Sequence, residues 1–171
     1  MKKYINKKVI TETSIYHGEV ILPENWFIDR DQFLLHQVYS EMKQKDFVVC
    51  KPFDMLNAYV SEYMYLEYDI RLENRETWGT EYNPLERSKP LKHIDYYNLH
   101  NSRDFVLLYG VRVEDCIINI IYNDNRDLKS EYKIQLKNNE YVLFPTSCSY
   151  YIENNQTKKS NFIHTITYNK Y

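Results

Sequence analysis

The stretch FVLLYGVRVEDCIINIIY, residues 105–122, contains two apolar runs separated by the turn-forming pair Glu114 and Asp115. Both runs are rich in the β-branched and aromatic residues that favour strands. The sequence therefore predicts two strands, Phe105 to Val113 and Cys116 to Tyr122, joined by a short turn. Because they hold the most continuously apolar residues of the chain, we expect them in the middle of the core.

Further short strands follow at regular spacing, separated by asparagine-rich turns such as Asn138-Asn139. In one of them apolar and polar residues alternate, which is typical of a strand with one face in solvent. Seven short strands within about 80 residues favour two packed antiparallel sheets, as in a sandwich or jelly roll. Besides the first two, the expected strands are Leu91 to Tyr96, Ser130 to Leu136, Glu140 to Phe144, Ser149 to Ile152 and Phe162 to Tyr168.

The first 90 residues have a different character. Helical spacing of apolar residues predicts amphipathic helices near residues 29–45 and 54–72, which would back one of the sheets. Glu73 to Pro90 shows neither the helical spacing of apolar residues nor the alternation typical of a strand, and is expected to be a long loop. Short strands are expected at Val9 to Thr13 and Glu19 to Leu22. The predicted fold class is mainly β with α, in a single domain 1–171 whose support region 1–90 precedes a core at 91–168.

Composition narrows the function classes. The 171 residues carry a net charge of −2 without a long basic block, which argues against a duplex DNA binder. No apolar run is long enough to cross a membrane and the N-terminus lacks a secretory h-region, so we expect a cytoplasmic protein. Its three cysteines are too widely spaced for a cysteine-based zinc site and are expected to be reduced. The bias toward Asn, Lys, Ile and Tyr suggests AT-rich codons, as in many bacteriophages and low-GC bacteria.

One motif suggests metal chemistry. In His93-Ile94-Asp95, an imidazole and a carboxylate stand two residues apart, so in a strand both would point to the same face. Such a pair can bind one metal ion without special backbone geometry. The spacing alone is common, and a surface strand with two polar side chains is the simpler interpretation.

The segments that follow this motif make the indication of a metal site more specific. The chain has His-x-Asp on the first strand of an antiparallel series, then the segment Leu143-Phe144-Pro145-Thr146, and then a closing strand from Phe162. In this order of features it resembles the 2-oxoglutarate and Fe(II) dependent oxygenases of the prolyl-hydroxylase-like group. The resemblance covers about residues 91–168. It implies a double-stranded β-helix, also called a jelly roll or cupin-like fold, with two N-terminal covering helices. It also implies Fe(II) and 2-oxoglutarate as cofactors if the protein is active, with His93 and Asp95 as metal ligands.

Two positions depart from the family pattern. Tyr150 or Tyr151 stands where the second metal histidine of the family is expected, and we assign Tyr151 as the third ligand. Ser160 and Asn161 stand where a cation would bind the far carboxylate of 2-oxoglutarate, and neither carries a charge. His100 and His164 are the other candidate donors, although His164 shares its strand face with apolar residues.

Two functions from different classes remain. The chain is either an iron and 2-oxoglutarate oxygenase, or a divergent and catalytically inactive relative of one, or it is a non-enzymatic jelly-roll protein that acts through interactions, for instance a phage virion or accessory component. For the second we expect a protein partner or homo-oligomer, no membrane, and a place in the host cytoplasm or the virion. The 18 tyrosines favour it, because aromatic side chains often anchor interfaces.

Overall fold

The computed structural model describes residues 13–24, 26, 51–94, 97–98, 102–123, 129–154 and 159–171. The helix predicted over 29–45 lies outside these residues, as does nearly all of the strand predicted at Val9 to Thr13. The elements are β1 (Tyr16–Glu19), α2 (Lys51–Tyr68), β2 (Leu72–Tyr82), β3 (Phe105–Arg112), β4 (Cys116–Asn123), β5 (Lys129–Leu136), β6 (Glu140–Pro145), β7 (Ser149–Asn154) and β8 (Asn161–Lys170).

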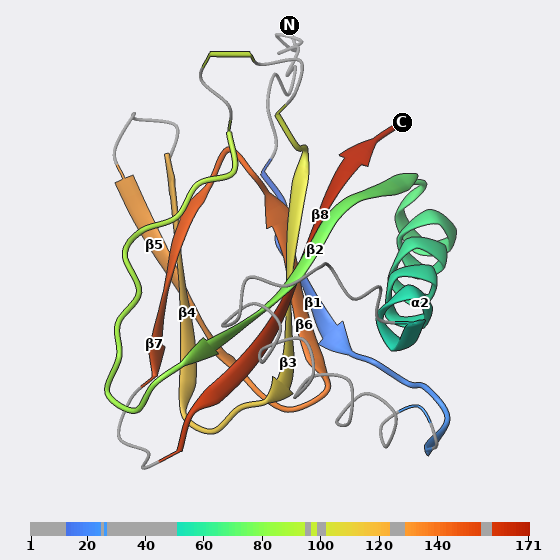
Figure 1. Ribbon diagram of the computed structural model, residues 1–171. Helices are drawn as coiled ribbons and strands as arrows, with labels where there is room; N and C mark the ends of the chain where they lie inside the picture. The colour runs from blue at the N-terminus through green and yellow to red at the C-terminus, as the bar shows by residue number, and fades with distance from the viewer. Residues whose placement is uncertain are drawn as a thin grey trace, which may run out of the picture.

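The strands form two antiparallel sheets (Figure 1). The five-stranded sheet has the order β1-β6-β3-β8-β2, and the three-stranded sheet has the order β5-β4-β7. The predicted two-sheet β arrangement is confirmed, and β3 to β8 agree with six predicted strands to within two residues at each end. The two most apolar strands, β3 and β4, lie in the middle of their sheets as expected.

A hydrophobic core lies between the two sheets, and alternate residues of each strand point into it. Val106 and Leu108 on β3 contribute to it from the five-stranded sheet, and Ile118 and Ile120 on β4 from the other. All four side chains are fully buried. Burying residues of this kind contributes about 1.5–3 kcal/mol each, so this core is a principal source of stability.

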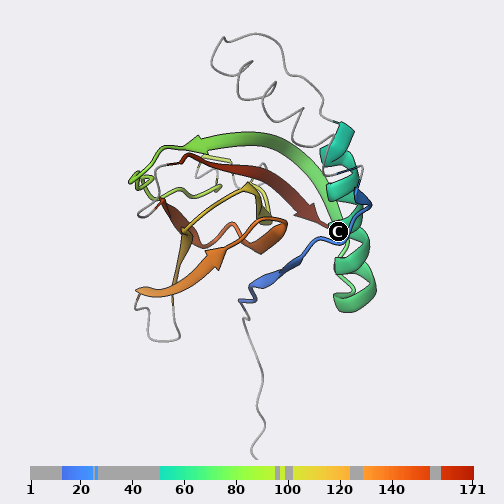
Figure 2. The same ribbon diagram turned by 90° about the horizontal axis from the view of Figure 1, so that it is seen from below.

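A second core lies on the other side of the five-stranded sheet, where α2 covers it (Figures 1 and 2). Leu56, Val60 and Met64 recur at helical spacing and are fully buried against residues such as Leu107 of β3. This confirms that a helix in this region backs one sheet. It starts at Lys51 rather than Asp54, because proline is tolerated in the first turn of a helix, as Pro52 is here.

The helix ends earlier than predicted. Asp69 adopts a left-handed conformation with φ of 53°, and its N–H donates to the carbonyl of Tyr65 at 3.1 Å. This is a common way to terminate a helix, although glycine usually holds that position. The chain then turns directly into β2.

Two sequence expectations are wrong. The loop predicted over Glu73 to Pro90 is largely the strand β2, which pairs along its whole length with β8. The strand predicted from Leu91 is not formed over the described residues, since Leu91 makes only an isolated bridge to Tyr150 and no strand follows up to Ile94. A third expectation is shifted, because β1 covers Tyr16–Glu19 instead of Glu19 to Leu22. In the described part of the chain, no helix has the length and apolarity that crossing a membrane requires.

Candidate functional site

His93 lies against the inner face of β7. Two backbone hydrogen bonds between Leu91 and Tyr150, of 2.7 and 2.9 Å, hold the preceding segment beside this strand. They place the Nε2 atom of His93 3.0 Å from the phenolic oxygen of Tyr150. The Trp78 ring of β2 lies 5.5 Å from the imidazole, so the half-buried His93 contacts one strand of each sheet.

The electrostatics of this pair favour neutral forms. Burial lowers the pKa of His93, and the nearby Glu76 carboxylate opposes this with a smaller effect. Burial likewise raises the pKa of the Tyr150 phenol, which is only 2% exposed. At neutral pH the contact is therefore a hydrogen bond between a neutral imidazole and a neutral phenol, with the donor set by the imidazole tautomer.

Tyr151 lies on the opposite face of β7, because successive residues of a strand point to opposite sides. Its hydroxyl donates a hydrogen bond to the Glu131 carboxylate of β5, which raises its pKa. The Arg87 guanidinium lies over its ring, 4.2 Å from the ring centre. Of the two tyrosines it is Tyr150, and not the assigned Tyr151, that the structure brings to His93.

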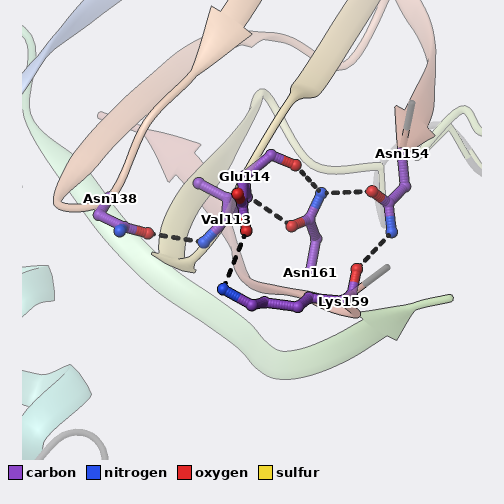
Figure 3. Close-up of polar contacts among 6 residues, drawn as sticks. All are labelled: Val113, Glu114, Asn138, Asn154, Lys159 and Asn161. Atoms are coloured by element: carbon purple, nitrogen blue, oxygen red, sulfur yellow. Dashed lines mark hydrogen bonds and ion pairs between the residues drawn. The ribbon is translucent and has the colours of Figure 1, made fainter. Parts of the chain in front are cut away.

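Asn161 belongs to a buried amide network at one end of β8 (Figure 3). Its Oδ1 accepts from the N–H of Glu114 at 2.7 Å, and its Nδ2 donates to the Glu114 carbonyl at 3.0 Å. The same Nδ2 donates to Oδ1 of Asn154 at 2.9 Å. The amide thus ties the β3–β4 turn to β7 and β8, while Ser160 beside it is half-buried.

His164 is fully buried on the α2 side of β8, away from His93. Its ring stacks on Phe53 with centroids 3.4 Å apart and planes 8° apart, and its Nε2 lies 2.6 Å from Oγ1 of Thr77. Burial lowers its pKa to about 3, so it is neutral under ordinary conditions. It holds the start of α2 on the sheet and does not face the space between the two sheets.

In the part of the chain that the structure describes, these side chains do not assemble the donor set of a ferrous centre with 2-oxoglutarate. A ferrous facial site needs two imidazoles and a carboxylate, whereas His93 meets a neutral phenol. Among the described residues, no three His, Cys, Asp or Glu side chains converge on one point. Asp95 and His100 lie outside the described residues. Asn161 has no charge with which to pair a carboxylate, and its hydrogen-bonding groups are already used.

Two residues beside His93 lie on β2, within the segment for which the sequence predicts a loop. Trp78 packs against His93, and the Glu76 carboxylate near it forms an ion pair with Arg103 at 3.1 Å. The available signal was the β-favouring run from Thr77 to Tyr82, interrupted by Gly79 and by a glutamate.

Comparison with other proteins gives a fold but no family. No protein-family model matches this sequence, and no curated protein sequence matches it either. Solved structures with a similar fold include a prolyl-4-hydroxylase from Pseudomonas putida, with a TM-score of 0.62 and 8% identity over 93% of this chain and 94% of that one. A prolyl hydroxylase from Trichoplax adhaerens, in complex with a hypoxia inducible factor peptide fragment, has a TM-score of 0.62 and 14% identity over 90% and 82% of the two chains.

The non-heme alpha-ketoglutarate-dependent epimerase SnoN from nogalamycin biosynthesis is also similar, with a TM-score of 0.67 and 6% identity over 91% of this chain and 77% of that one. The resemblance inferred from the sequence is therefore confirmed at the level of the fold. At such identities the likeness extends no further, because one scaffold supports many functions.

Proposed function

We propose that this chain is a non-catalytic protein with the fold of the 2-oxoglutarate oxygenases, a double-stranded β-helix, and that it acts by binding another protein. The hydrogen bond between His93 and Tyr150 carries the proposal. It occupies Nε2 of His93, one of the two imidazole nitrogens that can bind a metal, and it does so with a phenol whose pKa is raised by burial.

A second observation supports the same proposal independently. The position at which the resemblance implies a cation holds Asn161, whose amide makes three hydrogen bonds inside the protein. Placing the far carboxylate of 2-oxoglutarate there would break this network and leave a buried charge unpaired, which is strongly unfavourable. Both cofactors of the fold would thus lose a binding group.

The second candidate is an active or divergent oxygenase that uses His93 and Asp95. The observation that favours it is the placement of His93 on the inner side of β7 as a neutral imidazole, the form that binds metals. The two candidates differ in one measurable quantity, which is turnover of 2-oxoglutarate.

Succinate formation with Fe(II), ascorbate and 2-oxoglutarate separates them. We expect the wild-type protein and the His93→Ala variant to give the same background. Robust turnover by the wild type that His93→Ala abolishes would overturn the proposal and restore the oxygenase. Substrate-independent oxidation of ascorbate is controlled for by omitting the protein.

For the cellular setting, we propose a bacteriophage accessory or virion component present in the host cytoplasm. The bias toward residues with AT-rich codons supports such an origin. A non-catalytic fold with 18 tyrosines suits an interaction role, because tyrosine contributes a large amphipathic contact surface at low entropic cost.

A further inference from the structure

The helix α2 carries apolar residues on its outer face as well as on its buried face. Met55, Tyr65 and Leu66 are 47%, 43% and 69% exposed, and helical spacing places them with Glu62 opposite the buried stripe. Among the described residues, five of the eleven large apolar side chains that are exposed lie on this helix. A helix that covers a sheet normally has a polar outer face, so this pattern indicates a binding surface.

After Lys51, its first residue, the charged side chains of this helix are all acidic. From Phe53 to Ile70 the sequence has four carboxylates, Asp54, Glu62, Glu67 and Asp69, and no lysine or arginine. All four are exposed, and no ion pair joins them to another side chain in the part of the chain that the structure describes. The whole chain is nearly balanced at −2, so this is a local separation of charge.

Two of these carboxylates lie at positions where a negative charge destabilises the helix. Glu67 lies in the last turn of α2 and Asp69 directly follows it, where the helix dipole presents partial negative charge and basic residues are favoured. No basic residue is present in that turn. A cationic partner would offset this unfavourable arrangement.

The protein itself shows how a cation binds here. The Arg71 guanidinium lies over the ring of exposed Tyr65, 5.0 Å from the ring centre, and donates to its hydroxyl at 3.4 Å. Stacking of arginine on tyrosine is favourable at exposed sites. The tyrosines and carboxylates of α2 thus offer guanidinium and ammonium groups both a ring face and an opposite charge.

We propose that the outer face of α2, defined by Met55, Glu62, Tyr65 and Leu66, is the docking surface for a protein segment that presents arginine or lysine side chains alternating with apolar ones. The inference rests on the proposed function, since it names the partner class of a binding protein. The carboxylates would repel a second copy of the same face, a nucleic acid and an anionic membrane.

The test uses the full-length protein and a fluorescent peptide of arginine, leucine and alanine matched in length to α2. A counterpart with glutamate in place of arginine serves as the peptide control. We expect saturable binding of the arginine peptide only, measured by fluorescence anisotropy, with an affinity that falls as salt is added. Absence of saturable binding, or equal binding of both peptides, would overturn the proposal.

Matched variants locate the surface. Glu62→Gln combined with Glu67→Gln should weaken binding about tenfold. Asp115→Asn combined with Glu81→Gln removes the same charge elsewhere and should leave binding unchanged. Equal weakening by both pairs would show general electrostatic attraction and overturn the proposal. Removing the Glu67 charge should leave the urea midpoint unchanged or raise it, so weaker binding cannot reflect unfolding.

The apolar part of the surface is tested by a second pair, a variant and its control. Leu66→Ser should weaken binding, while Leu85→Ser, at a side chain that is similarly exposed on a distant turn, should not. If the peptide fails to bind while the succinate assay remains at background, only the docking surface is wrong. Turnover in that assay would instead remove the proposed function itself.

Discussion

The phenolic oxygen of Tyr150 lies 3.0 Å from Nε2 of His93, although 57 residues separate them in the chain. In a protein with the fold of the ferrous oxygenases, an imidazole on the inner side of the sandwich is hydrogen-bonded to a neutral phenol. This hydrogen bond therefore contributes to the stability of the protein and also occupies Nε2 of His93, an atom that could otherwise bind iron.

Tyr150→Phe should remove this hydrogen bond and leave Nε2 of His93 without its partner. We expect a loss of about 0.5–1.5 kcal/mol in the free energy of unfolding, measured by urea denaturation. Tyr168→Phe is the matched control, because the Tyr168 hydroxyl is buried with no hydrogen-bond partner in the described structure. That variant should be neutral or slightly stabilising, and equal losses in the two variants would contradict the assigned bond.

Asn161→Ala should be more destabilising than its volume suggests. The change removes the hydrogen bonds that Asn161 makes to the N–H and the carbonyl of Glu114 and to Oδ1 of Asn154, at about 1–3 kcal/mol for each group that stays buried. Asn138→Ala, which removes one hydrogen bond to the N–H of Val113, should cost less. A melting temperature for Asn161→Ala equal to that of Asn138→Ala would show that the network contributes little.

His164 should make stability depend on pH. Its pKa is about 3 in the folded protein and about 6.5 when unfolded, so below pH 6.5 the unfolded state takes up a proton that the native state does not. The contribution is complete above pH 6.5 and declines by about 1.4 kcal/mol per pH unit toward pH 3. His164→Phe keeps a ring to stack on Phe53 and should lose less stability between pH 7.5 and 5.0 than the wild type, by about 2 kcal/mol.

The urea midpoints of both proteins at the two pH values measure this difference. Carboxylates and His93 titrate in both proteins, so they cancel in the comparison. Identical pH dependence in the two proteins would mean that His164 is protonated in the native state.

Gly110→Ala should be poorly tolerated. A Cβ at this position would lie 2.3 Å from the backbone carbonyl oxygen of Lys137, between β5 and β6, which is closer than a real Cβ atom approaches backbone. Overpacking of this kind costs about 1–3 kcal/mol or more. Gly18→Ala is the control, because its Cβ would meet the Tyr141 ring at an ordinary 3.5 Å. Thermal denaturation of the two variants should differ clearly, and similar melting temperatures would contradict the close approach at Gly110.

The sequence was informative where apolar periodicity and turn residues coincide, as in β3 and β4 around Glu114 and Asp115. It failed for β2, because that strand is polar, lies at a sheet edge and pairs only with β8, which is distant in sequence. The alternation of apolar and polar residues does not predict a strand of this kind, since its stability comes from pairing with the neighbouring strand β8.

The candidate site was predictable only in part. The resemblance pointed to Tyr150 or Tyr151, but the choice depends on which face of β7 turns inward. A shift of one residue in strand register exchanges the two faces. The role of Asn161 was also hidden, because its partners Glu114 and Asn154 come from a turn and a strand that only the folded chain brings together.

Whether His93 holds iron can be measured by anaerobic equilibrium dialysis against Fe(II), followed by iron quantification, for the wild type, His93→Ala and Tyr150→His. Tyr151→His serves as a control on the opposite face of β7. We expect background iron in the wild type, in His93→Ala and in Tyr151→His, with any gain confined to Tyr150→His, which places a second imidazole beside the first. Stoichiometric iron in the wild type that His93→Ala removes would contradict this expectation.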